Sequence, residues 1–221
     1  MILLVAATEM EAAPLRARGV GEGNALLLSG VGLLETAVRL GRRLCEEGES
    51  ISLVLNFGVA GAYPGSGAGL LDLCLAAEEV LGDFGICQGE TTLPFPPHLG
   101  GQTIFPLSPA PIALAVESLS RHGLAVRKGT FLTVQGASAT TSRGVSLRKT
   151  HQALCENMEG AAVARLCAEL SLPCLELRAV SNLVEERNPA AWRLEEASER
   201  CAAAVAVLIA EFSGQGAWVR P

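Results

Sequence analysis

Short, wholly apolar runs alternate along the chain with longer segments in which apolar and polar positions recur at helical spacing. This alternation is typical of strands and helices that follow one another in an α/β fold. The predicted strands are residues 2–7, 25–29, 51–57, 72–80, 126–134 and 174–180. The predicted helices are residues 33–47, 111–122 and 189 to about 212, with two more that begin at Pro14 and Met158.

Residues 156–188 combine a helical pattern with polar residues where an α/β fold binds ligands. Apolar side chains recur at every fourth position from Met158, which predicts one buried stripe of an amphipathic helix. Glu159 would then lie in its first turn, near backbone donors without helical partners and the positive end of the dipole. The strand that follows carries Ser181 and Asn182 at its carboxyl end. Ligands of open α/β sheets bind at that end, so we expect the active site here.

Two connections between the predicted elements have no clear periodicity. Residues 81–107 are rich in Gly, Pro and Thr and predict a long irregular loop, which in a compact domain tends to be a lid or a binding loop. A second, polar connection follows residue 134. Neither has the composition of a linker and no repeat is present, so we expect residues 1–221 to form one domain.

Composition and charge narrow the class of protein. The 221 residues are 49% hydrophobic, which is enough for a full core and argues against disorder. The net charge is -6 and no basic cluster could follow a phosphate backbone, so we expect no nucleic acid partner. Residues 1–7 lack a basic flank, Glu9 and Glu11 follow them, and no apolar run reaches the roughly 18–20 residues that span a bilayer. We therefore expect no membrane partner.

Cysteines and glycines indicate neither a metal nor a cofactor. The seven cysteines are scattered without a C-x-x-C pair, which is typical of reduced thiols in a cytoplasmic protein. Gly30 and Gly32 lack the third glycine of a dinucleotide fingerprint, because Glu35 occupies its position. The glycine-rich run at 58–69 lacks the Gly-Lys-Ser/Thr ending of a P-loop.

Two interpretations of the glycines in that run remain open. Gly65, Gly67 and Gly69 can supply the positive φ of tight turns or contribute to a binding loop. Gly58 and Gly61 directly follow the predicted central strand, where a backbone without Cβ atoms can approach a ligand closely.

Five short motifs occur in an order that is known from one superfamily. They are Ala7-Thr8-Glu9-Met10-Glu11, Ser29-Gly30-Val31-Gly32, Asn56-Phe57-Gly58-Val59-Ala60-Gly61, Asn157-Met158-Glu159-Gly160 and Arg178-Ala179-Val180-Ser181-Asn182. Together they resemble the nucleoside phosphorylases and methylthioadenosine nucleosidases over nearly the whole chain. Within this superfamily the chain is most similar to the futalosine hydrolase family, because of Asn182, the residues that end at Tyr63, and the tail at 187–192. The resemblance implies a three-layer α/β sandwich with a mixed, partly barrel-like sheet flanked by helices, a purine nucleoside substrate and a homo-oligomer.

The chemistry of that superfamily needs particular side chains. Cleavage of an N-glycosidic bond passes through an oxocarbenium-like sugar, so the site needs negative charge near the ribose and a base for water. By resemblance, Glu159 binds the ribose hydroxyls and stabilises the cation; alternatively it is only a charge at the helix start. Glu11 deprotonates water, with Glu9 as the competing candidate, and either one could instead be a surface charge. Asn182 completes the catalytic set, because its amide group can donate to both O6 and N7 of hypoxanthine.

The resemblance also implies a substrate-binding set. Met158 would pack against the sugar, although a methionine in an apolar stripe is equally typical of a core. Phe84 would stack on the base or only anchor its loop. The other members are Val59, Ala60, Gly61, Asn157, Glu159 and Ser181.

One wall of the implied pocket departs from the superfamily. Residues 135–140 are small and polar where the nucleosidases carry an aromatic residue. A wider pocket would suit futalosine, whose 5′ substituent is a benzoate-bearing chain. The candidates to meet its carboxylate are Arg143, Arg148, Arg187 and Arg193, and the sequence does not choose among them.

Three classes of function follow. The first is hydrolysis of futalosine to hypoxanthine and dehypoxanthine futalosine in menaquinone biosynthesis, with methylthioadenosine and adenosylhomocysteine as alternative nucleosides. The second is a phosphorylase, which the chain disfavours: phosphorylases of this superfamily carry an arginine just before the glycine that follows the central strand, and Phe57 stands there. The third is a non-catalytic nucleoside binder, which has little use for a glutamate that activates water.

Overall fold

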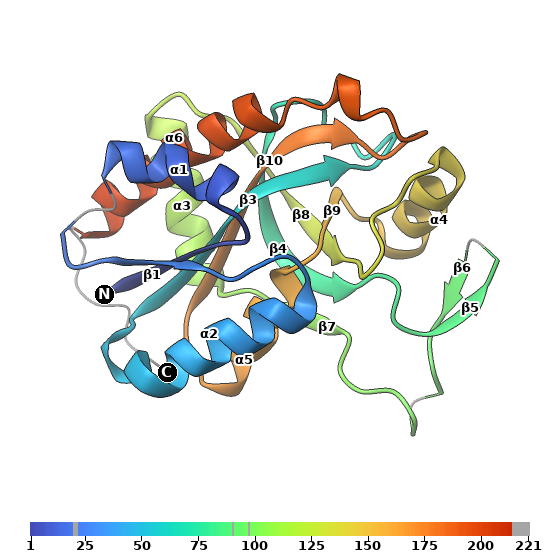
Figure 1. The fold of residues 1–221 in the computed structure, drawn as a ribbon, viewed down its shortest axis with the longest axis horizontal. Helices are drawn as coiled ribbons and strands as arrows, with labels where there is room; N and C mark the ends of the chain where they lie inside the picture. Colours follow the sequence, from blue (N-terminus) through green and yellow to red (C-terminus); the bar gives the residue numbers. More distant parts are fainter. Residues whose placement is uncertain (20–21, 90, 97, 214–221) are drawn as a thin grey trace.

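The computed structural model describes residues 1–221 except 20–21, 90, 97 and 214–221 (Figure 1). The strands are β1 (Ile2–Ala6), β2 (Ala25–Leu28), β3 (Leu53–Ala62), β4 (Leu73–Leu81), β5 (Ile86–Gln88), β6 (Thr91–Leu93), β7 (Ile104–Pro106), β8 (Val126–Thr133), β9 (Cys155–Asn157) and β10 (Cys174–Leu183). The helices are α1 (Glu9–Arg18), α2 (Leu33–Glu47), α3 (Pro109–Arg121), α4 (Thr141–His151), α5 (Gly160–Glu169) and α6 (Leu194–Ser213), with 3-10 turns at Gly48–Ser50 and Pro189–Ala191.

The main sheet is mixed and partly closes on itself. Five strands form a ring in the order β10, β4, β8, β9 and β3, and β3 pairs again with β10. β1 and β2 extend the sheet from β3, and β7 pairs with β4. β1, β3 and β10 run parallel to one another, whereas β4 runs antiparallel to β10. The prediction of a mixed, partly barrel-like sheet is therefore confirmed.

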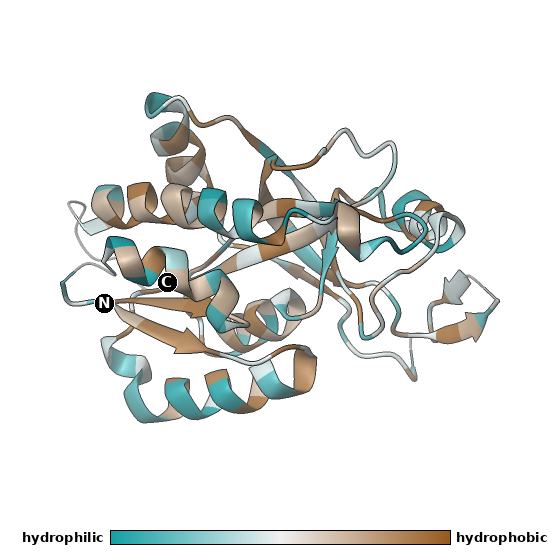
Figure 2. Cartoon of the chain, turned by 45° about the horizontal axis from the view of Figure 1, so that its top comes forward, coloured by the Kyte–Doolittle hydropathy of each residue, from teal (hydrophilic) through white to brown (hydrophobic). Residues whose placement is uncertain are grey.

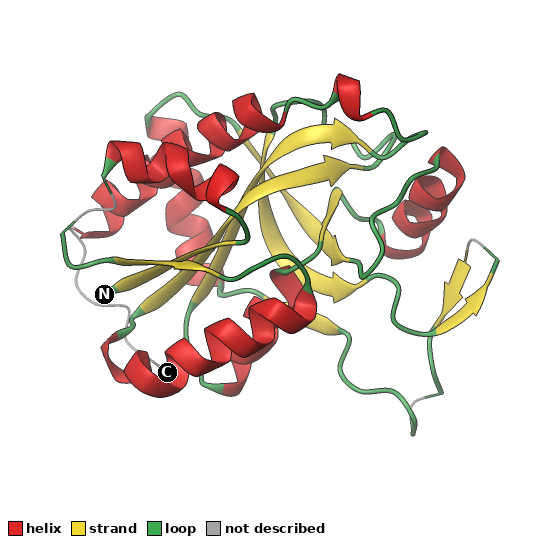
Figure 3. Cartoon of the chain, viewed as in Figure 1, coloured by secondary structure: helices red, strands yellow, loops and turns green. Residues whose placement is uncertain are grey.

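Helices cover this sheet on two sides (Figure 3). α6 packs on β10 and β3 with α1 and α3 beside it, and α2 and α5 lie together on the other side. β1 is buried along its whole length, which explains why its sequence is a continuous apolar run. In Figure 2 the strands are mostly brown, whereas the helices carry both teal and brown residues, as expected for a three-layer α/β sandwich with its core between sheet and helices.

The first helix begins earlier than the pattern predicts. α1 begins at Glu9 and not at Pro14, which lies inside the helix. Thr8 caps its N-terminus, and Glu11 accepts a hydrogen bond from the Thr8 backbone, so the two residues form a capping box. The spacing of Thr8 and Glu11 in the sequence is the signal that could have located this start.

The helix after β9 begins later than predicted. Residues 155–157 form a strand, α5 begins at Gly160, and Glu159 is its N-cap. The predicted stripe is correct only in its middle. Ala162 is buried and Leu166 packs against the core, but Met158 precedes the helix and Leu170 is 43% exposed. Small side chains on the buried face of α5 let it approach the sheet closely. The last helix also begins later, at Leu194.

Two segments contain structure that local periodicity did not predict. Residues 81–107 are not one irregular loop: β5 and β6 form a hairpin and β7 returns to pair with β4. The polar connection after β8 contains α4, in which only Gly144 and Leu147 are buried. Such elements depend on contacts with distant segments more than on their own apolar pattern.

The structure also bears on the cysteines and on membrane association. All seven cysteines are free thiols, and Cys45 and Cys87 are exposed whereas the other five are buried. No helix in the part of the chain that is described is long and apolar enough to cross a membrane.

Candidate active site

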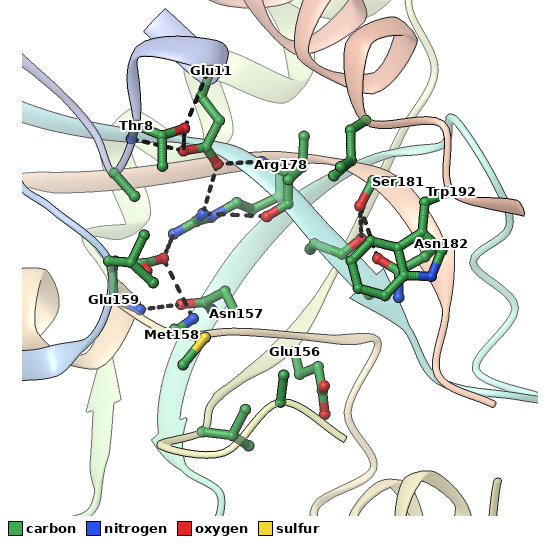
Figure 4. Close-up of a pocket in the computed structure, with 18 of the residues that line it drawn as sticks. Thr8, Glu11, Glu156, Asn157, Met158, Glu159, Arg178, Ser181, Asn182 and Trp192 are labelled. Carbon is green, nitrogen blue, oxygen red and sulfur yellow. Dashed lines mark hydrogen bonds and ion pairs between the residues drawn. The ribbon is translucent and has the colours of Figure 1, made fainter. Parts of the chain in front are cut away.

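A cavity of about 310 Å³ lies where β1, β3 and β10 end (Figure 4). Most of the residues predicted from the sequence line it, although they come from four separate parts of the chain. These residues are Glu11, Val59, Ala60, Gly61, Asn157, Met158, Glu159, Ser181 and Asn182. The parallel strands bring their carboxyl ends to the same edge of the sheet, which is where such folds bind ligands.

Glu11 is 4% exposed and its carboxylate is held by three donors. Its Oε2 atom accepts from the Thr8 backbone at 3.0 Å and from the Thr8 hydroxyl at 2.8 Å. Its Oε1 atom accepts from the Val59 backbone at 3.0 Å. These three contacts fix the side chain at the edge of the cavity, in the position that a general base requires.

Gly58 makes room for this carboxylate. β3 does not end at Phe57 as predicted but continues to Ala62 through its pairing with β10. A Cβ atom at Gly58 would lie 2.2 Å from Glu11 Oε1 and 3.0 Å from an Arg178 nitrogen. The glycine is therefore needed for the approach of two side chains of the protein.

Arg178 lies between the two candidate catalytic carboxylates (Figure 4). Its Nη2 is 3.3 Å from Glu159, its Nη1 is 3.8 Å from Glu11, and its Nε donates to Glu176 at 2.9 Å. Burial alone would lower the pKa of Arg178, but the three carboxylates outweigh it and raise the pKa. One buried cation thus keeps Glu11 and Glu159 close together. The sequence motif contained Arg178 without indicating this position, although an arginine two residues after a glutamate in a mostly apolar strand is a signal of a buried ion pair.

Glu159 is positioned by backbone contacts on both sides. Its Oε1 accepts from the Gly32 backbone at 3.0 Å, so the Gly30-Val31-Gly32 turn contacts this glutamate. Asn157 Oδ1 accepts from the backbone of Glu159 at 2.9 Å and of Gly160 at 2.7 Å, which satisfies donors at the start of α5. The amide of Asn157 is thus committed to the protein, although the residue borders the cavity.

A pair of buried carboxyl groups lies behind Asn157. Glu79 accepts from Asn157 Nδ2 at 2.6 Å and from the Thr133 hydroxyl at 2.7 Å, and it neighbours Glu176. Burial and the charge of Glu176 raise the pKa of Glu79 well above its ordinary value. A Cβ atom at Gly160 would lie 2.1 Å from Glu79 and 2.5 Å from Glu176. This pair supports the turn that carries Glu159 and the guanidinium of Arg178.

Asn182 lies at the other end of the cavity, beside Ser181 and Trp192 (Figure 4). Ser181 donates to Asn182 Oδ1 at 2.9 Å, and Asn182 Nδ2 donates to the Leu183 carbonyl at the long distance of 3.3 Å. The amide group therefore keeps donor capacity for a ligand. Trp192, which the sequence did not single out, carries the Arg187 guanidinium 4.6 Å above its ring.

Two candidates named from the sequence lie elsewhere. Phe84 does not line this cavity; it contacts Phe95 edge to face at 5.4 Å and borders a separate cavity of about 470 Å³. Phe84 is 47% exposed, and it lies outside the cavity that the other candidates share. Glu9 faces solvent and pairs with Arg16, whereas Glu11 two residues on points into the cavity.

The wall at 135–140 is built from small side chains. Ala137 and Ser138 border the cavity, and Ser138 donates to Glu156 from its backbone and its hydroxyl. Of the four arginines left open by the sequence, Arg187 lines the cavity. Arg143 pairs with Asp83, Arg193 pairs with Glu196, and Arg148 borders a different hollow.

Comparison with known proteins agrees with this geometry. Residues 19–212 match the family model described as the phosphorylase superfamily. The sequence is 38% identical to a futalosine hydrolase of Thermus thermophilus over 97% of both chains, and 35% identical to one of Streptomyces coelicolor over 80% of this chain and 74% of that one. A futalosine hydrolase mutant of Helicobacter pylori has the same fold, with a TM-score of 0.85 and 22% identity over 95% of this chain and 98% of that one. A methylthioadenosine/adenosylhomocysteine nucleosidase of Helicobacter pylori superposes with a TM-score of 0.84 at 21% identity, over 95% and 97%.

Proposed function

The chain belongs to the phosphorylase superfamily, and within it to the futalosine hydrolases, and we propose from this that it hydrolyses the N-glycosidic bond of futalosine. The products would be hypoxanthine and dehypoxanthine futalosine, as a step of menaquinone biosynthesis in the cytoplasm. The observation that carries the proposal is the pair Glu11 and Glu159, held against one guanidinium and open to a cavity that ends at Asn182.

Each of these side chains has a role in the proposed reaction. A bond forms from the water oxygen to C1′ of the ribose while the bond from C1′ to N9 of the purine breaks. Glu11 accepts the proton of the water, and Glu159 binds the ribose hydroxyls and stabilises the positive charge on the sugar. The purine leaves as an anion whose N7 and O6 share the electrons of the broken bond and face the amide group of Asn182, and it takes up a proton from solvent to become hypoxanthine.

The remaining pocket residues shape the site around the sugar. Met158 packs against the ribose, and Val59, Ala60 and Gly61 form the wall beside it with their backbone and small side chains. Ser181 orients Asn182 through its hydroxyl.

We expect the reaction to proceed without phosphate. Arg178, the cation beside Glu11 and Glu159, already faces these two carboxylates and Glu176, so a phosphate dianion added there would meet an excess of negative charge. Purified protein incubated with futalosine, inosine, methylthioadenosine and adenosylhomocysteine, with and without phosphate, tests this by the release of free base. Base release from futalosine that requires phosphate and yields a sugar 1-phosphate would show a phosphorylase instead.

Arg187 is the proposed partner of the futalosine carboxylate. It lines the cavity and is oriented by Trp192, and hydrogen bonds to charged groups contribute about 1.5–3 kcal/mol. Arg187→Ala should therefore raise KM for futalosine by roughly 10- to 100-fold and leave KM for inosine, which lacks the carboxylate, nearly unchanged. Arg193→Ala is the matched control, because Arg193 pairs with Glu196 outside the cavity. An equal effect of Arg187→Ala on both substrates would contradict the assignment.

We further propose that the chain forms a homo-oligomer through the start of α2. Val31, Leu34 and Val38 are 54%, 76% and 62% exposed, and Val31 also lines the cavity. An apolar strip that continues from a pocket mouth is typical of an interface. Sedimentation should give a mass of at least two chains, which Leu34→Asp reduces to one. Leu170→Asp, at a 43% exposed site on α5, should leave the mass unchanged, and a monomeric unmodified protein would contradict the proposal.

A further inference from the structure

Glu156 is a buried carboxylate that borders the cavity and has no part in the reaction described above. It is 7% exposed, and its oxygens accept from the Ser138 backbone at 2.8 Å, the Ser138 hydroxyl at 2.7 Å and the Tyr63 hydroxyl at 3.0 Å. A carboxylate has about four acceptor sites, so three donors leave capacity for one more. The remaining site is available to a ligand in the cavity.

Strand pairing places Glu156 in line with Asn182. Gly61 on β3 pairs with Glu156 on β9 and with Asn182 on β10, so the three residues form a row across the ring. A Cβ atom at Gly61 would lie 3.0 Å from Asn182 Nδ2, 3.1 Å from Val184 Cγ2 and 3.6 Å from Glu156 Cγ, so these side chains lie on the same face of β3. Two strand spacings separate them, roughly 9.5 Å between backbones. Gly61, Glu156 and Asn182 all line the cavity, so a purine bound there could contact both polar groups.

We propose that Glu156 accepts the N1–H of a 6-oxopurine whose O6 and N7 face Asn182, and that it thereby selects 6-oxopurine over 6-aminopurine nucleosides. This inference rests on the proposed function and extends it to the identity of the base. A 6-oxopurine carries a hydrogen on N1, whereas N1 of a 6-aminopurine carries a lone pair. An ionised carboxylate only accepts hydrogen bonds, so it binds the N1–H of a 6-oxopurine and repels the N1 lone pair of a 6-aminopurine.

Glu156 is surrounded by hydrogen-bond donors and one cation. Burial raises the pKa of Glu156 above the ordinary value of a glutamate, and the hydrogen bonds from Ser138 and Tyr63 and the charge of Arg143 limit this rise. Arg143 donates to the Ser138 hydroxyl at 3.2 Å and pairs with Asp83 at 3.1 Å, which fixes it beside this group. Glu156 also links the wall at Ser138 to Tyr63, and this anchoring role is the competing explanation that the test must separate.

The test compares kcat/KM for futalosine and its 6-amino analogue in the unmodified protein and in Glu156→Gln. The glutamine amide can accept from N1–H or donate to a bare N1, so the preference for futalosine should fall by at least about tenfold. A role in anchoring alone would lower both values equally. An unchanged ratio would therefore overturn the inference. Ser138→Ala is the matched control, because it removes one donor from Glu156 but keeps the carboxylate, and it should preserve the ratio.

A binding measurement separates this inference from the proposed function. Calorimetry with hypoxanthine, adenine and 1-methylhypoxanthine needs no catalysis and no 5′ substituent. The unmodified protein should bind hypoxanthine at least about tenfold more tightly than adenine or 1-methylhypoxanthine. Glu156→Gln should reduce the difference in affinity between hypoxanthine and adenine. Equal binding of hypoxanthine and 1-methylhypoxanthine by the unmodified protein would overturn the role of Glu156, whether or not the variant folds. If the unmodified protein cleaves no nucleoside, the proposed function is wrong, but these affinities still test whether Glu156 selects the base.

Discussion

Glu11→Gln should lower kcat for futalosine by roughly 10²- to 10⁴-fold, with little change in KM. The amide has the shape of the carboxylate but cannot accept the proton of the attacking water. Glu11 contacts neither Asn182, the proposed partner of the base, nor the wall at Ser138, so substrate binding should persist. The glutamine amide has one acceptor oxygen, so it cannot accept hydrogen bonds from both Thr8 and the Val59 backbone. The lost hydrogen bond should lower the free energy of unfolding by roughly 0.5–2 kcal/mol. Steady-state kinetics of hypoxanthine release give kcat and KM, and circular dichroism checks the fold.

Glu9→Gln provides the matched control. Glu9 lies two residues away on the same helix, but its side chain is 55% exposed and pairs with Arg16 at the surface. The Glu9→Gln variant should therefore have the same kcat as the unmodified protein. Turnover that survives in Glu11→Gln, or that is lost in Glu9→Gln, would assign the water-activating role to another group.

Arg178→Met should lower the free energy of unfolding by about 3–5 kcal/mol, because it leaves buried carboxylates without their cation. Glu11, Glu159 and Glu176 all face this guanidinium, and Glu176 is itself buried. Methionine is similar in length to the aliphatic part of the arginine side chain, so lost packing contributes little to the expected change. Urea denaturation measures the difference.

Arg127→Met shows what a surface pair contributes. Arg127 pairs with Asp72 at 2.7 Å, but both side chains are partly exposed, and such pairs contribute about 0–1 kcal/mol. A loss in Arg178→Met no larger than that in Arg127→Met would mean that the buried carboxylates do not depend on the arginine.

Much of the fold follows from local pattern. The segment of β1 is an apolar run because the strand is buried along its whole length, and α2 was predicted with its observed bounds of 33–47. The start of α5 was misplaced because the apolar side chains after Met158 mimic a longer helix, whereas the backbone pairs as β9 first. The start of α1 was missed because Pro14 drew the prediction, although Thr8 and Glu11 have the spacing of a capping box.

The sequence by itself determined the family, the α/β class and the identity of most polar residues around the cavity. Short motifs and the pattern of apolar and polar positions within one segment are local properties of the chain. Only the tertiary structure decided how these residues meet. Arg178 joins Glu11 and Glu159, and Glu156 lies in one row with Asn182, through pairings between segments far apart in the chain. The contact from Glu11 to the Val59 backbone spans 48 positions. No periodicity within one segment encodes such a partner, since the interaction energy belongs to both segments and exists only once they pack together.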